Sequence, residues 1–95
     1  MTYVEEARRT LEAELPGQQD SLMDLYLLLV FTKGTETTAE DVHDAWAIWR
    51  SRTRPDHPAI IPFTDLHPDT ARLDDEYVDA IHRAALAWAP SKGGM

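Results

Sequence analysis

The chain has 95 residues, 43% of them hydrophobic and 27% charged, which allows one globular domain with one modest core. A formal net charge of −8 disfavours binding to polymeric nucleic acid, because phosphate backbones attract basic surfaces. The absence of cysteine excludes disulfides, thiolate metal ligands and cysteine nucleophiles. The N-terminus lacks a signal-peptide pattern, and the longest apolar run, residues 25–31, is too short to cross a membrane. A cytoplasmic protein with no membrane partner is therefore expected.

The spacing of apolar residues predicts an all-α fold, a single small domain of four helices. The first helix is expected over residues 2–15, beginning with a capping box of Thr2 and Glu5. "PGQQD" ends it, and Asp20 or Ser21 is expected to cap a second helix that runs to about residue 33. Gly34 is then the left-handed residue that stops the second helix.

The second helix is apolar around almost its whole circumference between residues 22 and 31. A helix of this kind lies at the centre of a core, or half of its surface faces a second copy of the protein. A homodimer through helix 22–31 is therefore one of the two interpretations of this segment.

A third helix is expected over residues 37–52. Its capping box is Thr37 with Glu40 or Thr38 with Asp41, since both pairs have the required spacing.

A proline-stiffened, extended connector is expected over residues 55–68, because its four prolines exclude a continuous helix. In the fourth helix, Leu73 is expected to form a hydrophobic staple and Asp74 the N-cap. Pro90 is expected to end this helix, which leaves residues 91–95 as a disordered tail.

No catalytic group, metal site or cofactor is expected. The chain has no glycine-rich phosphate loop and no Gly-x-Ser-x-Gly elbow, and its paired acids near residue 75 suit the first turn of a helix. The histidines do not share a helix face at metal-ligand spacing, which favours structural roles for all four: His43, His57, His67 and His82.

Aromatic and cationic residues gather at the end of the third helix. Trp46 and Trp49 share a helix face, and Arg50, Arg52 and Arg54 follow directly. A flat aromatic ring beside guanidinium groups suits a ligand that combines a base with a phosphate. The alternative is that the arginines pair with the surplus carboxylates of this acidic chain.

The stretches "VHDAWAIWR" (42–50) and "DHPAIIPFTDLHPDTARLDDEYVDAIHRAAL" (56–86) resemble the ryanodine-receptor-type (RyR) domain. The likeness covers roughly residues 40 to 88. It divides the chain into an N-terminal helical pair (1–36), an RyR-like module (37–90) and the tail. The family's Gly-Trp-x-Tyr-Gly stretch is missing, and the first 35 residues have no counterpart in the pattern.

The resemblance implies a ligand-sensing module for nucleotide-derived molecules. We therefore expect a non-catalytic binding module, a sensor or a sponge, for a small anionic nucleotide-type ligand. The alternative is a homo-oligomeric structural or interaction protein without a small ligand. The abundance of arginine over lysine suggests an actinobacterium or its phage as the source. The expected ligand-binding residues are Trp46, Trp49, Arg50, Arg52, Arg54, His57, Pro62 and Phe63.

Overall fold

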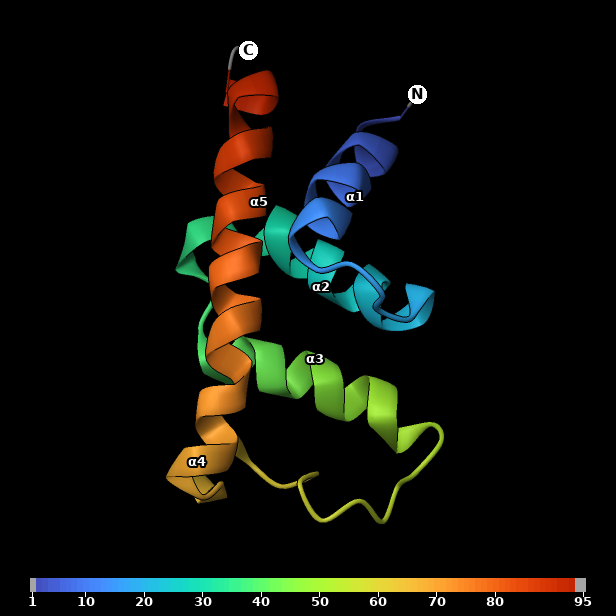
Figure 1. Ribbon diagram of the computed structural model, residues 1–95, viewed down its shortest axis with the longest axis vertical. Helices are drawn as coiled ribbons and strands as arrows, with labels where there is room; N and C mark the ends of the chain where they lie inside the picture. Colours follow the sequence, from blue (N-terminus) through green and yellow to red (C-terminus); the bar gives the residue numbers. More distant parts are fainter. Residues whose placement is uncertain (1, 94–95) are drawn as a thin grey trace.

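The computed structural model describes residues 2–93 as one compact all-α domain without a strand (Figure 1). Its four helices of twelve residues or more confirm the predicted fold class. The α-helices are α1 (Tyr3–Glu14), α2 (Asp20–Thr32), α3 (Ala39–Ser51), the single turn α4 (Pro68–Ala71) and α5 (Asp75–Gly93). Three 3₁₀ turns stand between them: η1 (Gly34–Glu36), η2 (Phe63–Asp65) and η3 (Arg72–Asp74).

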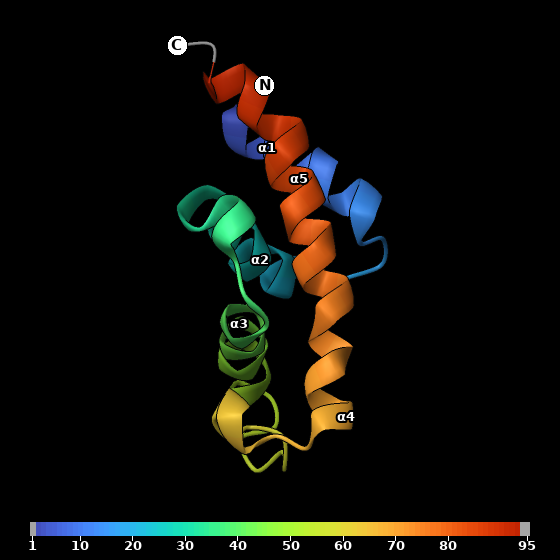
Figure 2. The same ribbon diagram turned by 90° about the vertical axis from the view of Figure 1, so that its left-hand side faces the viewer.

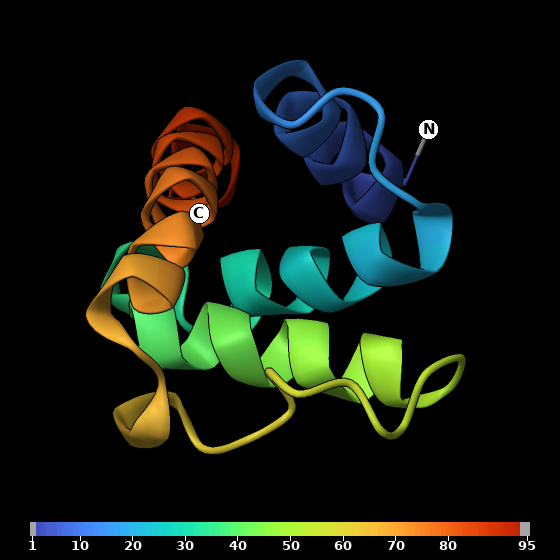
Figure 3. The ribbon, with the colours of Figure 1, turned by 60° about the horizontal axis from the view of Figure 1, so that its bottom comes forward.

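The four long helices pack around a shared core. α2 and α3 lie side by side and run in opposite directions (Figure 3). α5 packs against both of them, and α1 packs against the C-terminal half of α5 (Figure 2). After α3 the chain turns back beneath that helix before it reaches α4 and α5 (Figure 1). This return segment closes one side of the pocket described below.

Each of the four long helices contributes its apolar face to the core. The largest fully buried side chains are Leu11, Tyr26, Val42 and Ile81, one from each of them. α2 alone buries five residues, and Leu28 is its one apolar side chain with a large exposure, 55%. The core thus accounts for most of the apolar character of residues 22–31, since a single exposed leucine is ordinary on a protein surface.

Two of the predicted capping boxes are present, and the predicted cap of the second helix is wrong. The Thr2 side chain accepts a hydrogen bond from the Glu5 backbone N–H, and the Glu5 carboxylate accepts one from the Thr2 backbone N–H. This pair confirms the predicted start of α1. At α3 the pair is Thr38 with Asp41. At α2 neither Asp20 nor Ser21 is the cap, because the helix begins at Asp20 and its N-cap, one residue earlier, makes no side-chain bond.

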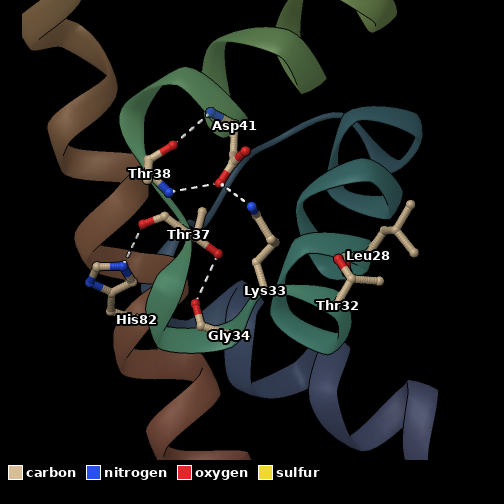
Figure 4. A network of polar contacts seen from close by, with 8 residues as sticks. All are labelled: Leu28, Thr32, Lys33, Gly34, Thr37, Thr38, Asp41 and His82. Carbon is tan, nitrogen blue, oxygen red and sulfur yellow. Dashed lines mark hydrogen bonds and ion pairs between the residues drawn. The ribbon is translucent and has the colours of Figure 1, made fainter.

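The turn between α2 and α3 is held by a local polar network (Figure 4). Gly34 has a φ of +56°, the left-handed conformation that its position after a helix predicted. The buried Thr37 donates its hydroxyl to the Gly34 carbonyl at 2.8 Å, and its own carbonyl accepts from His82 Nε2 at 2.7 Å. Lys33 Nζ lies 3.6 Å from the Asp41 carboxylate. The network fixes α3 against α2 and α5 at this end.

The segment from residue 52 to 67 contains no α-helix, as its prolines predicted. Short hydrogen-bonded turns alternate there with extended residues such as Pro62 and Leu66. Helical structure resumes at Pro68, where His67 is the N-cap and accepts from the Asp69 backbone. A proline at the first helical position is favourable, because the N–H that it lacks would have no partner there.

The predicted bounds of the last helix are wrong at both ends. Asp74 belongs to η3 and is continuous with the helical turn before it, so it is not the N-cap, and Leu73 is 69% exposed rather than packed as a staple. α5 passes Pro90 and runs to Gly93. The proline was predicted to end the helix because it lacks a backbone N–H. A helix can nevertheless continue past a proline when it loses that one hydrogen bond. Of the expected tail, residues 94–95 lie outside the described residues.

Replacing Ile81 by alanine tests the core. Ile81 is fully buried on α5, so its truncation should lower the free energy of unfolding by about 2–5 kcal/mol through lost burial and a residual cavity. Urea unfolding followed by circular dichroism measures this change. Leu86→Ala, on the same helix but 63% exposed, is the matched control and should change stability by less than about 0.5 kcal/mol. Equal losses in the two variants would contradict the assignment of the core.

Candidate functional site

A pocket of about 470 Å³ lies where α2, α3, the connector and the start of α5 meet. Its volume is in the range typical of small-molecule sites. The Gly17–Gln19 loop before α2 also contributes to the lining. The lining residues are Gly17, Gln18, Gln19, Leu22, Tyr26, His43, Trp46, Trp49, Arg50, His57, Ala59, Leu66, Thr70, Leu73, Asp74 and Tyr77.

Aromatic rings form much of the pocket wall, and their neighbours hold them in place. The Trp46 ring stacks against His43 with centroids 5.8 Å apart and meets the edge of His57 at 5.1 Å. Trp49 donates its indole N–H to the Ser21 hydroxyl at 2.9 Å, which ties the end of α3 to the beginning of α2. Rings fixed in this way offer a preformed flat surface to a ligand.

Arg50 is the one arginine or lysine among the residues that line the pocket. Its guanidinium carbon lies 4.7 Å from the centroid of the Trp49 ring, a cation–π geometry. Its Nε is buried and has no hydrogen-bond partner in the described part of the chain. Although the chain is acidic, no carboxylate within residues 2–93 forms an ion pair with Arg50. The pocket therefore contains a cation with unused donors.

His43 also lines the pocket, although the residue is only 4% exposed. Its Nε2 is 2.7 Å from the carbonyl oxygen of Ile61 in the connector. A carbonyl oxygen only accepts, so Nε2 carries a proton and donates it. The other ring nitrogen, Nδ1, is 4.0 Å from a carboxylate oxygen of Asp74.

Asp74 places a largely buried carboxylate on the pocket wall, with its side chain 15% exposed. Burial raises the pKa of this carboxyl above its usual value, and the negative charge of Asp75 adds to the rise, while His43 opposes it. Tyr26 and Tyr77 stand nearby, with ring centroids 5.6 Å apart. Burial likewise raises the pKa of the Tyr26 hydroxyl, so this group stays protonated and can donate.

The structure brings four of the eight expected site residues together in the pocket: Trp46, Trp49, Arg50 and His57. Arg52 and Arg54 follow the last turn of α3, are exposed and do not line the pocket. Pro62 is exposed, and Phe63 is half-buried with its ring 6.1 Å from His43, outside the lining.

Several lining residues that carry polar atoms were not expected from the sequence. Tyr26, Tyr77 and Asp74 come from α2, α5 and η3, and their convergence depends on helix packing. One signal was present: Tyr26 stands inside an apolar run, where a hydroxyl must find a partner or an opening. Asp74 was assigned to a helix cap, which hid its position on the pocket wall.

No group of three or more metal-ligating side chains comes together within residues 2–93. No helix in this part has the length and apolar character needed to span a bilayer.

The fold and the pocket together define a small all-α domain with an aromatic-walled cavity. The chain belongs to the family described as "Domain of unknown function (DUF7701)", whose model matches residues 2–86. No curated protein and no solved structure matches the chain.

The family match corrects the resemblance to the ryanodine-receptor-type domain, which was wrong. The match includes the first two helices, for which that pattern had no counterpart. The pattern depended on a few histidines, prolines and aromatic residues around the connector. Prolines recur in connectors between helices for general conformational reasons, so their spacing was weak evidence of kinship.

Replacing Asp74 by asparagine should stabilise the protein at neutral pH. The folded-state pKa of Asp74 is raised, so the native state retains the proton to a higher pH than the unfolded state does. Stability is therefore lost as the pH rises through the window between the ordinary and the raised pKa. The advantage of Asp74→Asn should be full above this window and should disappear below it.

Urea unfolding at several pH values measures the difference between wild type and variant. Asp75→Asn, which removes a neighbouring but exposed charge, is the matched control and should show a much smaller difference. A wild-type protein more stable than Asp74→Asn at neutral pH would show that the interaction with His43 outweighs the cost of burial.

Proposed function

We propose that this domain is a non-catalytic binding module for a small anionic ligand of the nucleotide type. The observation that carries the proposal is Arg50, whose guanidinium lines an aromatic-walled pocket with a buried Nε that lacks a partner. Buried polar groups in proteins are nearly always hydrogen-bonded, so a buried donor without a partner, on a residue that lines the pocket, favours a role for Arg50 in binding a ligand.

The charge of the ligand follows from Arg50. A guanidinium presents five N–H donors in a planar fork that matches the oxygens of a phosphate or carboxylate. Within the described residues no acidic side chain occupies this fork, which disfavours the alternative that Arg50 neutralises a surplus carboxylate. The net charge of −8 repels anions in general, so a single cation inside a pocket suits a small anion rather than a polyanion.

The flat part of the ligand follows from the tryptophans. Trp46 and Trp49 share one face of α3, and both line the pocket. A planar base can stack on such rings, at a gain of about 1–3 kcal/mol for each base. A nucleotide combines a stacking ring with an anionic group, and the pocket offers a complement to each.

A panel of nucleoside monophosphates, with the free nucleosides as uncharged counterparts, tests the proposal by thermal shift. A ligand at about one hundred times its Kd should stabilise the fold by about 2.7 kcal/mol, which raises the Tm of a chain of this size by about 10 °C or more. For the ligand that binds, Arg50→Gln should weaken the affinity about ten- to a hundredfold through the loss of charge-assisted hydrogen bonds.

The matched control is Arg54→Gln, which removes the same charge from outside the pocket and should leave the affinity within about twofold of the wild type. A folded protein that binds no member of the panel contradicts the proposal and favours the interaction protein instead. Equal losses in both arginine variants would place the anion outside the pocket.

A further inference from the structure

The carboxylate of Asp74 lacks a hydrogen bond although its side chain is only 15% exposed. No N–H or O–H group of residues 2–93 donates to either of its oxygens, and the 4.0 Å separation from His43 Nδ1 is too long for a hydrogen bond. The carboxylate lines the pocket, where a ligand can reach it. A largely buried carboxylate that no protein group hydrogen-bonds is costly, so this position favours a ligand that supplies a donor.

The neighbours of Asp74 leave its carboxylate directed to the pocket. His43 is held by the Ile61 carbonyl and by the Trp46 ring. Its Nδ1 therefore stays 4.0 Å from the Asp74 carboxylate and forms no hydrogen bond with it. Asp75 raises the pKa of the Asp74 carboxyl, but its own side chain is exposed and does not line the pocket. Asp74 is the one carboxylate among the lining residues, and an ionised carboxylate favours donors over acceptors on a ligand.

This acidic end is well separated from the cationic end. His43, beside Asp74, and Arg50 lie seven positions apart on α3, which corresponds to about 10 Å along the helix axis. Trp46 and Trp49 lie between them on the same face. The pocket thus has a carboxylate at one end, aromatic walls in the middle and a guanidinium at the other.

We propose that the ligand is a guanine-type nucleotide, whose base presents two adjacent N–H donors to Asp74 while its phosphate contacts Arg50. This inference rests on the proposed function and names the ligand class for the same site. An ionised carboxylate is acceptor-only and its two oxygens match two parallel donors. Guanine offers such a pair, its ring N–H and exocyclic amine. In adenine and cytosine the amine adjoins a ring nitrogen that is an acceptor, which would face a carboxylate oxygen unfavourably.

Calorimetric titration with guanosine, inosine and adenosine 5′-monophosphates tests the proposal. Inosine monophosphate differs from the guanosine compound only in lacking the exocyclic amine, so the pair isolates one donor. The wild type should bind guanosine monophosphate about ten- to a hundredfold more tightly than inosine monophosphate, the worth of a hydrogen bond to a charged group. Adenosine monophosphate should bind more weakly than the guanosine compound.

The preference should disappear in Asp74→Asn, in which one carboxylate oxygen is replaced by a donor amide that opposes the N–H groups of guanine. Asp75→Asn is the matched control, because it removes the same charge from the next residue, whose side chain is exposed. The preference for guanosine monophosphate should persist in this variant. Circular dichroism of each variant verifies that it is folded.

The outcomes separate this inference from the proposed function. If the three nucleotides bind with equal affinity, or if the preference survives in Asp74→Asn, the guanine assignment is wrong while the anion site at Arg50 stands. If no nucleotide binds to the folded wild type, the proposed function fails and this inference fails with it. Arg50→Gln should weaken guanosine and inosine monophosphates by the same factor, because both carry the same phosphate.

Discussion

The hydrogen bond between His43 Nε2 and the Ile61 carbonyl, 2.7 Å long, is the contact on which the pocket depends. The connector that follows α3 forms only isolated turns and has no helix of its own to hold its position. His43 fastens it to α3, and the edge of His57 against Trp46 adds a second attachment. With the connector held there, α3 acquires an opposite wall, and the pocket becomes a cavity rather than an open helix face.

The pocket keeps polar groups in conditions that do not favour folding. The Arg50 Nε is buried without a partner and the Asp74 carboxylate is largely buried without a donor. Each lowers the stability of the domain, because solvation is lost and no hydrogen bond replaces it. Stability alone therefore does not explain why these two polar groups are present. Both residues line one pocket, and this is the physical basis of the proposed binding function.

The sequence predicted the helices well because their signals are local. Capping boxes require residues three positions apart, and apolar faces repeat within a single helix, so Thr2, Thr38 and Gly34 fell in the expected roles. The errors came where a local signal competed with the rest of the fold. Aspartate is a common N-cap residue, but the residues before Asp74 are already helical. The carboxylate of Asp74 lies instead beside His43.

The sequence by itself determined an all-α domain, the approximate bounds of α3 and the exclusion of α-helix from residues 55–67, because propensity, capping and proline geometry act between near neighbours. It also placed Trp46, Trp49 and Arg50 on one helix in reach of each other. Only the tertiary structure decided which arginine enters the pocket, since Arg52 and Arg54 lie beyond the last turn of α3. It also decided that Tyr26 and Asp74 line the same pocket, because packing joins helices that are distant along the chain and no local pattern records which of their faces meet.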